Sequence, residues 1–242
     1  MPPALHAPAH GHSRILGIGG YRPRRVVTNA EVCERIDSTE EWIETRSGIR
    51  SRRFAGADET LTFMAQAAAG KTLAHAGVPA TDIDLVLLAS MSNLSQTPPR
   101  AVRVAHEIGA HRAAGVDLSA ACAGFCHALA MASDAVSAGS ARHVLVIGAE
   151  RMTDIVAPDD RTTSFLFGDG AGAVVVGPSQ EPAIGPTVWG SEGDKAETIK
   201  QTYSWDRFGG DLAELPRDGK GDLKLPAITQ EGQAVFRRAV FE

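Results

Sequence analysis

The sequence predicts an α/β protein whose strands run largely parallel. From Arg14 onward, short apolar runs alternate with helical patterns, which is typical of strand–helix–strand units. Apolar runs such as "DLVLLAS" are nearly continuous, and this pattern indicates strands that are covered on both faces. A length of 242 residues allows one large domain or about two smaller ones.

The first expected elements are a strand and two short helices. "RILGIGG" predicts the strand and "TNAEVCERI" predicts the first helix. The Ser-Thr-Glu-Glu run at 38–41 spells a capping box that begins the second helix. This helix carries Trp42 and Arg46 and is expected to end near Gly48, because glycine is a common helix stop.

A longer helix comes next, followed by alternating strands and helices. The segment "ETLTFMAQAAAGKTLAHAG" is expected to begin after Asp58 as its N-cap and to end at Gly77. "DLVLLAS" then predicts a strand. Pro98 and Pro99 suit the first turn of a helix that runs to about Gly109. "GVDLSAA" predicts the strand after it.

The second half of the chain continues this alternation. A helix is expected from Cys122 to about Gly139, and "RHVLVIGAE" and "AGAVVVG" predict two further buried strands. The segment 209–226 is rich in Gly, Asp, Lys and Pro, which favours an exposed excursion. "QEGQAVFRRAVFE" begins an amphipathic helix that contains no stop signal, and its apolar face holds Val235, Phe236, Ala239 and Val240.

Composition favours a globular protein without a nucleic-acid or membrane partner. The formal net charge is −5, and acidic and basic residues are interspersed. No apolar run approaches the roughly 20 residues that cross a bilayer. The three cysteines are odd in number and lack the spacing of a disulfide framework, which favours a reducing compartment.

Residues 1–13 are expected to form a disordered tail. They are rich in Pro, Ala and His, and they lack the basic start and the apolar block of a secretory signal. His6, His10 and His12 could contact a metal, but an uncommitted solvated tail is the simpler interpretation. No metal site is therefore expected.

Cys122 is the candidate nucleophile. Ala120, Ala121, Ala123 and Gly124 surround it, so the backbone can turn sharply and leave room beside the sulfur. A thiol at a helix N-terminus is expected to have a pKa below the usual value of about 8.5 and can form a thioester. Buried packing of a free cysteine is an equally good interpretation of the local pattern.

Two neighbours of Cys122 are expected to have other roles. Cys126 lies one turn further along the predicted helix and is expected to belong to the core. No further cluster of Cys or His ligands accompanies this pair, so a metal site is not favoured. His127 would lie about 140° around the helix from Cys122, so it is not expected to act as its base.

The glycine-rich segment "FGDGAGAVVVG" does not fit a nucleotide-binding loop. A dinucleotide fingerprint requires a helix after the glycines, whereas a strand follows here, and no Gly-Lys-Ser/Thr of a phosphate-binding loop is present. Gly168, Gly170 and Gly172 are instead expected to form a tight turn in which backbones approach closely.

Trp42 and Arg46 form the second candidate site. They lie four residues apart and so share one face of the expected helix, a geometry that suits stacking on a purine while pairing with phosphate. Taken alone, the pattern fits better with a half-buried tryptophan beside a solvated basic surface.

Together these motifs resemble β-ketoacyl-acyl carrier protein synthase III, a condensing enzyme of the thiolase superfamily that starts fatty acid and some polyketide chains. The matching blocks occur in the family's order and cover nearly the whole chain after the tail. They are "ILGIGGYRPRRVVTN", "DSTEEWIETRSGIRSRR", "DLSAACAGFCHAL", "VLVIGAERMTD", "DRTTSFLFGDGAGAVVVG" and "EGQAVFRRAV".

The resemblance implies roles for individual residues. Cys122 takes an acyl group from acyl-CoA, and a carbanion released by decarboxylation of malonyl-acyl carrier protein then attacks the thioester. Trp42 and Arg161 look like the pair that holds the CoA adenine between them, with Thr162 beside Arg161 and Arg46 near the CoA phosphates. These substrates are expected to suffice, so no cofactor is expected.

The resemblance also implies a cytoplasmic homodimer whose partners are acyl-CoA and acyl carrier protein. Thr97 aligns with a position that reaches across the dimer and limits the acyl pocket. Some members of the family have Phe there, so Thr97 leaves more volume. We therefore expect branched or longer starter groups to be tolerated.

The family fold has two similar βαβαβαββ halves in five α-β-α-β-α layers. By the resemblance, residues 14–180 complete the first half and residues 181–242 only begin a truncated second half. Family members continue with a His-Gln-Ala-Asn motif and a second Asn that stabilise the charge formed on decarboxylation. No histidine follows His143 in this chain and no asparagine follows Asn93.

Condensation by the 242-residue chain alone is therefore expected to be very weak, and three interpretations follow. The first is a synthase III that acts through Cys122 in an intact protein with a further C-terminal portion. The second is a non-catalytic subunit or remnant that binds acyl-CoA. The third is a thiolase-fold acyltransferase that works without decarboxylation.

Overall fold

The computed structural model describes residues 11–206, 215–217, 223–232 and 235. The chain divides into two compact units. The first contains residues 1–25, 53–151 and 169–188, and the second contains residues 26–52, 152–168 and 189–242. The expected boundary between two halves at residue 180 stays a prediction.

A five-stranded sheet is the centre of the first unit. Its strands lie in the order β1-β7-β6-β4-β5. Their bounds are β1 His12–Tyr21, β4 Leu85–Ala89, β5 Ala114–Leu118, β6 Val144–Arg151 and β7 Asp169–Ser179. The strand β4 runs parallel to β5 and to β6, whereas β7 runs antiparallel to β6 and to β1. The other strands of this sheet therefore all oppose β7, which confirms the expected, largely parallel arrangement.

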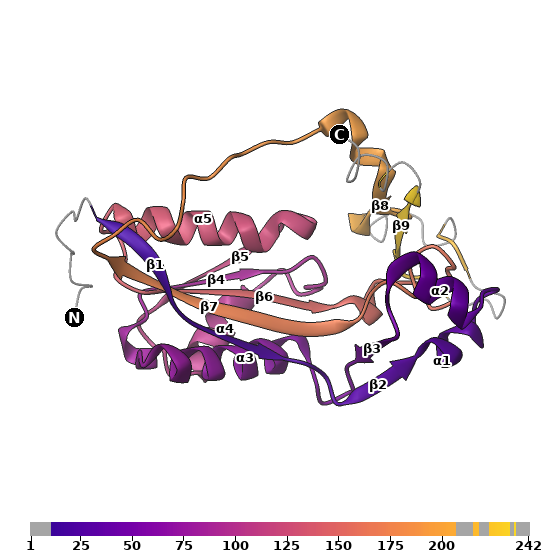
Figure 1. Ribbon diagram of the computed structural model, residues 1–242, viewed down its shortest axis with the longest axis horizontal. Helices are drawn as coiled ribbons and strands as arrows, with labels where there is room; N and C mark the ends of the chain where they lie inside the picture. The colour runs from indigo at the N-terminus through magenta and orange to yellow at the C-terminus, as the bar shows by residue number, and fades with distance from the viewer. Residues whose placement is uncertain (1–10, 207–214, 218–222, 233–234, 236–242) are drawn as a thin grey trace. The chain divides into compact units, whose positions relative to one another are not determined.

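Helices cover both faces of this sheet (Figure 1). The helices α3 (Leu61–Ala76) and α4 (Arg100–Glu107) pack on one face, and α5 (Gly124–Ser137) packs on the other. The core on the α3 side includes Met64 and Ile147, and the core on the α5 side includes Ala128 and Val146. Along the chain these elements read βαβαβαββ, which confirms the α/β class.

Glycines let two helices approach the sheet at backbone distance. A Cβ atom at Gly17 in β1 would lie 2.5 Å from the backbone nitrogen of Ala76 in α3. One at Gly115 in β5 would lie 2.6 Å from the backbone nitrogen of Val102 in α4. Real Cβ atoms essentially never come so close, so no larger residue fits either position without moving a helix.

One end of α3 agrees with the sequence prediction and the other does not. Gly77 ends the helix in the left-handed conformation with φ 64°, as expected. The expected N-cap, Asp58, was wrong: Thr60 caps the helix by accepting a hydrogen bond from the Phe63 N–H at 3.2 Å. Asp58 instead binds the Arg24 guanidinium at 2.6 Å.

The prolines before α4 lie outside the helix, contrary to the expectation. Pro99 occupies the N-cap position, and the helix begins at Arg100. The side chain of Pro99 makes no capping hydrogen bond. The carboxylate of Asp117 in β5 instead accepts hydrogen bonds from the N–H groups of Arg100 and Ala101, both at 2.7 Å.

Two strand boundaries also differ from the sequence prediction. The strand β1 begins at His12, inside the expected tail, because His12 pairs with Ser179 and the Ser13 hydroxyl is 2.8 Å from that of Ser133. Residues 1–10 lie outside the described residues. The expected glycine turn was wrong, since Gly170 and Gly172 lie within β7, where Gly172 pairs with strands on both sides and Gly170 pairs with Glu150 in β6. Close backbone approach does occur at Gly170, where a Cβ atom would lie 3.2 Å from the Tyr21 carbonyl oxygen.

The second unit contains short elements. They are α1 (Asn29–Cys33), α2 (Glu40–Ser47), most of the two-stranded β2–β3 sheet (Arg25–Thr28 and Ser51–Phe54), and the β8–β9 pair (Ile199–Gln201 and Ile228–Gln230). Thr39, not Ser38, caps α2 by accepting from the Trp42 N–H at 3.1 Å. Gly48 ends this helix with φ 72°. Most of the 209–226 excursion and the expected terminal helix lie outside the described residues.

Glu59 is a buried carboxylate that joins three segments of the first unit. It accepts hydrogen bonds from the Gly56 N–H at 2.8 Å, the Tyr21 hydroxyl at 2.6 Å and the Arg24 N–H at 3.0 Å. The Gly56 N–H, followed by the Tyr21 hydroxyl, lowers the pKa of Glu59 from 4.5 to about 2. Its side chain is only 2% exposed, so the charge is held by these donors and not by water.

Replacing Gly17 tests the close approach of α3. Gly17→Ala is expected to lower the free energy of unfolding by about 1–3 kcal/mol, because the new methyl group meets helix backbone. Gly70→Ala is the matched control: it lies inside α3, and its new methyl group would have no atom within 4 Å, so it should raise stability by about 0.5–1 kcal/mol. Urea unfolding of both variants measures the change in the free energy of unfolding, which should fall for Gly17→Ala and rise for Gly70→Ala. A Gly17→Ala protein as stable as the parent would contradict the close packing of α3 on β1.

The Glu59 network predicts a pH-dependent stability. A carboxylate with a lowered pKa stabilises the fold above its unfolded pKa, so this contribution is lost as the pH falls from about 4.5 to about 2. Glu59→Gln is expected to be clearly less stable than the parent protein at pH 7, and the difference should vanish near pH 2. Thermal unfolding across this range measures it. Asp58→Asn is the control, because its 70% exposed carboxylate pairs with exposed Arg24 and should contribute little.

Candidate active site

Cys122 lies in a tight turn directly before α5. The turn spans Ala121–Ala123 and is closed by a 3.0 Å hydrogen bond from the Ala123 N–H to the Ala120 carbonyl. Ala121 has φ 45°, a left-handed conformation that is uncommon for a residue with a side chain and costs of order 1–3 kcal/mol. The Cys122 side chain is exposed. The local backbone therefore presents a cysteine thiol to solvent at the start of a helix.

The N-terminus of α5 carries no side-chain cap. Its N-cap residue is Ala123, which has no polar side chain, so no side-chain hydrogen bond is made to the first helical N–H groups. Such groups and the helix dipole favour negative charge at this end. An oxygen that becomes negative during reaction would be stabilised there.

Small residues seat the start of α5 on the sheet. A Cβ atom at Gly124 would lie 3.2 Å from Ala89 Cβ at the end of β4. A Cβ atom at Gly148 in β6 would lie 3.2 Å from the Phe125 ring. The first turn of α5 is thus held tightly from below, which fixes the position of the Cys122 turn.

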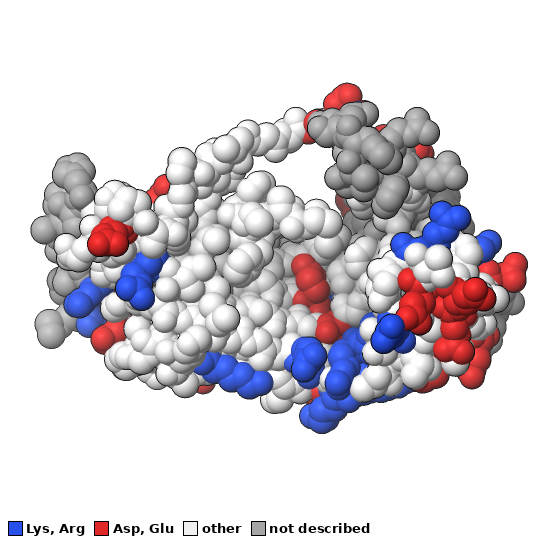
Figure 2. Space-filling view, in the orientation of Figure 1, with Lys and Arg blue, Asp and Glu red and all other residues white. Residues whose placement is uncertain are grey.

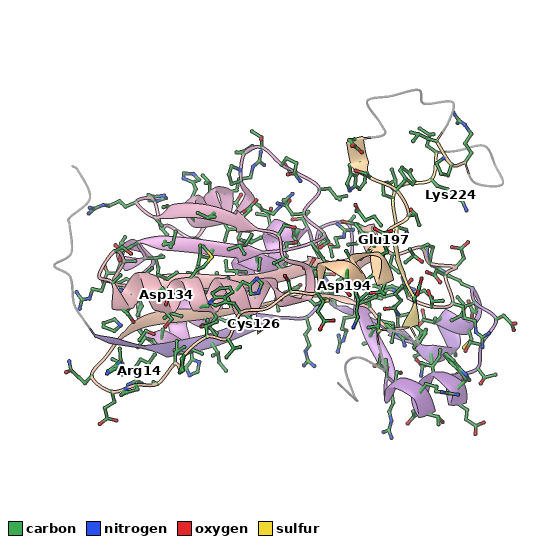
Figure 3. All side chains as sticks on the ribbon, turned by 90° about the horizontal axis from the view of Figure 1, so that it is seen from above. Arg14, Cys126, Asp134, Asp194, Glu197 and Lys224 are labelled. Carbon is green, nitrogen blue, oxygen red and sulfur yellow. The ribbon has the colours of Figure 1, made fainter. Side chains whose placement is uncertain are left out.

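Cys126 is exposed, so the expectation that it belongs to the core was wrong. The buried residues of α5 are Gly124, Ala128, Ala130, Ala132 and Val136, and Cys126 does not belong to this face. Figure 3 shows Cys126 along α5 together with the exposed Asp134. His127 is half-buried and follows Cys126 on the helix. Two exposed thiols therefore lie about one helical turn apart, and only Cys122 precedes the helix.

The loop after β4 carries Thr97, and carboxylates hold it at both ends. Thr97 is exposed. Glu150, at the end of β6, accepts hydrogen bonds from the N–H groups of Met91 and Ser92 at 2.9 and 3.0 Å. Asp117 binds the other end of the loop at the start of α4, as described above. Sequence reasoning missed both carboxylates, although a charged residue within or at the end of an apolar strand was a usable signal.

Trp42 and Arg161 lie in contact in the second unit, and their expected role in holding a purine stays a prediction. The Arg161 guanidinium carbon lies 5.2 Å from the centre of the Trp42 ring, within the range of a cation–π contact. Phe165 packs edge-on against the same ring, with centroids 5.5 Å apart. The 5.2 Å spacing is that of direct contact, so a purine placed between the two side chains has to displace the guanidinium.

A polar turn positions Arg161. The Asp160 carboxylate accepts hydrogen bonds from the Thr162 N–H and hydroxyl, both at 2.7 Å, and from the Thr163 hydroxyl at 2.8 Å. Gln230 donates to the Thr162 carbonyl at 2.9 Å. Arg161 and Thr162 are both exposed on this turn. Asp160 is a further residue that sequence reasoning did not single out.

Arg46 lies in the last turn of α2, four residues after Trp42, and is exposed. Arg52, which the sequence placed in the same basic segment, is instead buried and donates to Asn29 at 2.6 Å. The segment is therefore only partly a solvated basic surface. Arg46 remains available for an anionic ligand.

A separate hollow of about 480 Å³ lies at the end of β1. It is lined by Gly20, Tyr21, Arg22, Arg53, Lys71 and Ala171. Lys and Arg side chains gather along the lower edge of Figure 2, where β1 ends. None of the predicted site residues lines this hollow.

The described part of the chain holds neither a metal-binding cluster nor a membrane-spanning helix. No group of three or more His, Cys, Asp or Glu side chains there could hold a metal ion. Within the same residues, no helix combines the length and the apolar character needed to cross a bilayer.

Comparison with known proteins identifies the class. The family model for 3-oxoacyl-[acyl-carrier-protein (ACP)] synthase III matches residues 116–193. The β-ketoacyl-[acyl-carrier-protein] synthase III 1 of Streptomyces coelicolor is 60% identical over 243 residues, which cover 100% of this chain and 70% of that protein.

Solved structures agree with this comparison. The priming β-ketosynthase of the R1128 polyketide biosynthetic pathway has a TM-score of 0.89 at 54% identity and covers 98% of this chain and 69% of its own. The 3-oxoacyl-(acyl carrier protein) synthase III of Pseudomonas aeruginosa PAO1 has a TM-score of 0.82 at 32% identity, with 94% and 67% covered.

The fold and its relatives place the chain among the condensing acyltransferases of the thiolase superfamily. Within that class, the chain belongs to the β-ketoacyl-acyl carrier protein synthase III family. The resemblance inferred from the sequence motifs is therefore confirmed.

Proposed function

We propose that Cys122 is the nucleophile that takes the acyl group from acyl-CoA. Its sulfur attacks the thioester carbonyl, a new Cys122 thioester forms, and the bond to the CoA sulfur breaks. The proton of the Cys122 thiol is balanced by the proton that the released CoA thiol gains. One observation carries this proposal: an exposed thiol in a strained turn at the uncapped N-terminus of a helix.

The second proposed step is condensation with malonyl-acyl carrier protein. Loss of CO₂ leaves a carbanion that attacks the Cys122 thioester, forming a carbon–carbon bond and breaking the bond to the Cys122 sulfur. The products are 3-oxoacyl-acyl carrier protein and the Cys122 thiolate, which regains its proton from water. Its support is the family membership, since relatives are named as β-ketoacyl-carrier-protein synthases and one as a priming ketosynthase. The product would start a fatty acid or polyketide chain. Both substrates bring their own activated groups, so no cofactor is proposed.

Trp42, Arg161, Thr162 and Arg46 are proposed to bind the CoA nucleotide. The contact between Trp42 and Arg161 supports a site for an aromatic ring, since both a cation and an aromatic face can stack on a purine. Arg46 adds an exposed positive charge on the same helix as Trp42, suited to phosphate.

A cytoplasmic homodimer with Thr97 limiting the acyl pocket is also part of the proposal. The strand β5 lies at the edge of the sheet and exposes 41% of Val116, as a strand that meets a second copy would. Thr97 is small and exposed, which supports tolerance of branched or longer acyl groups. A strict preference for acetyl-CoA would contradict this specificity.

The nucleophile is tested by mass spectrometry of the full chain after incubation with acetyl-CoA. We expect one acetyl group on Cys122, abolished by Cys122→Ala and retained by Cys126→Ala. Cys126 is the matched control because it is also an exposed thiol and lies inside α5, four residues after Cys122. Equal labelling of both cysteines would show exposure without activation, and label absent from Cys122 would remove the mechanism. This readout needs only the acyl transfer step.

The nucleotide site is tested by the concentration dependence of Cys122 acylation. Trp42→Ala and Arg161→Ala are each expected to raise the acetyl-CoA concentration for half-maximal rate about tenfold, since a stacked ring contributes roughly 1–3 kcal/mol. The Cys122 alkylation rate with iodoacetamide should stay unchanged. Arg50→Ala is the control, because Arg50 is an exposed cation near α2 that pairs with Glu44 at 2.7 Å. An equal effect of Arg50→Ala would indicate general electrostatics instead.

A further inference from the structure

We propose that Asp117 is a positioning residue that sets the acyl selectivity of the protein by fixing the loop 90–99 on which Thr97 stands. The inference rests on the proposed role of Thr97 as the limit of the acyl pocket. Asp117 does not need to touch substrate. It acts through the loop, which it holds by side-chain and backbone hydrogen bonds.

The end of the loop is tied to β5 by Asp117. The helix α4 begins after two prolines, and Pro99 offers no capping side chain. The first N–H groups of α4 therefore have no side-chain acceptor from the N-cap residue. Asp117 supplies the partner from the neighbouring strand, with Oδ2 accepting from Arg100 N–H and Oδ1 from Ala101 N–H, both at 2.7 Å. These charge-assisted bonds fix the exit of the loop.

The middle of the loop is held through Asn93. Asp117 Oδ2 also accepts from the Asn93 side-chain amide at 2.9 Å. Asn93 Oδ1 in turn accepts from Arg100 Nε at 2.8 Å and from the Ser95 N–H at 3.2 Å. Asp117, Asn93 and Arg100 thus form a closed ring of hydrogen bonds. Arg100 is held further by donating to the Thr62 hydroxyl beside it in α3 at 2.6 Å.

The start of the loop is held by Glu150 and by β5. Glu150 accepts from the Met91 and Ser92 N–H groups, and the Ser92 hydroxyl also donates to it. The Ser90 N–H donates to the Leu118 carbonyl in β5 at 3.1 Å. Residues 90–93 are therefore fixed before the loop reaches Thr97, and residues 100–101 are fixed after it.

The consequence is a short exposed span held between two anchors. Thr97 lies within this span, so its position follows from where Asn93 and Arg100 are placed. Asp117 binds both. The strand that carries Asp117 continues directly into the Ala121–Ala123 turn with Cys122. The Asp117 carboxylate therefore ties the loop that carries Thr97 to the strand that leads to the proposed nucleophile.

The same bonds also stabilise the fold, so a control must separate the two roles. Asp84 is suited to this because its Oδ2 accepts from two backbone N–H groups, those of Arg142 and His143, at 2.7 and 3.1 Å. It is half-buried like Asp117. Asp84 lies before β4, whereas the loop 90–99 follows this strand. Asp84→Asn removes a similar carboxylate without touching the loop.

The experiment measures rate constants for Cys122 acylation in the full chain by acetyl-, isobutyryl- and octanoyl-CoA, using intact-mass spectrometry. Asp117→Asn replaces one carboxylate oxygen, which accepts hydrogen bonds, by an NH₂ group that faces N–H donors and cannot accept from them. We expect the ratios of isobutyryl and octanoyl to acetyl rates to change by about tenfold toward one, as the loop loses its fixed position. Asp84→Asn should leave both ratios within about twofold of the parent values, because the Arg142 and His143 N–H groups that Asp84 binds lie outside the loop 90–99 and substitutions without shared partners rarely affect one another.

Further variants keep the inference falsifiable. Thr97→Phe should lower the octanoyl rate relative to the acetyl rate if Thr97 limits the pocket. If Thr97→Phe changes the ratio and folded Asp117→Asn does not, the role of Asp117 is wrong while that of Thr97 stands. If Thr97→Phe changes nothing, the role of Thr97 is wrong and the inference fails with it. Asn93→Ala opens the ring without removing the helix bonds, so it must shift the ratios in the same direction even if Asp117→Asn does not fold.

Discussion

The contact of helix backbone with strand backbone is the constraint on which the first unit depends. Glycines in β1 and β5 allow it on one face of the sheet, where Gly17 and Gly115 leave no space for a methyl group. On the other face Gly124 and Gly148 bring the start of α5 down onto β4 and β6. Because close-packed layers transmit small displacements, the position of the Cys122 turn is set by these glycines as much as by its own residues.

The strand ends explain why so much chemistry gathers at one edge of this sheet. The strands β4, β5 and β6 run parallel, so their carboxyl ends meet at the same edge. The loop with Thr97 follows β4, the turn with Cys122 follows β5, and Glu150 lies at the end of β6. Turns that leave parallel strands expose N–H groups that the sheet does not bind. Asp117 and Glu150 bind such groups, and the edge becomes rigid without further secondary structure.

Features that depend on residues close in the sequence were predicted correctly, whereas features that depend on contacts between distant residues were missed. Gly48 and Gly77 end their helices as expected, because a left-handed cap is a property of the glycine itself. The start of α4 was misplaced because its cap is Asp117, 17 residues away in the sequence, and no local signal reports it. Cys126 was assigned to the core because spacing gives a shared face but not which face the sheet covers. Trp42 and Arg161 are far apart in the chain, and only the family resemblance paired them.

The two sites differ in how they are prepared for a ligand. The Cys122 turn is formed by backbone geometry, so its strain is already present in the folded protein and need not be introduced on binding. The proposed nucleotide site is formed by side chains, and the Arg161 guanidinium already lies over the Trp42 ring. A purine must exchange this contact for its own, and an exposed cation–π contact of about 0.5–1 kcal/mol is a small loss against stacking on both sides. Stacking therefore stays favourable after this exchange, and the proposed role of Arg46 is to add charge recognition that favours a nucleotide over an uncharged aromatic ligand.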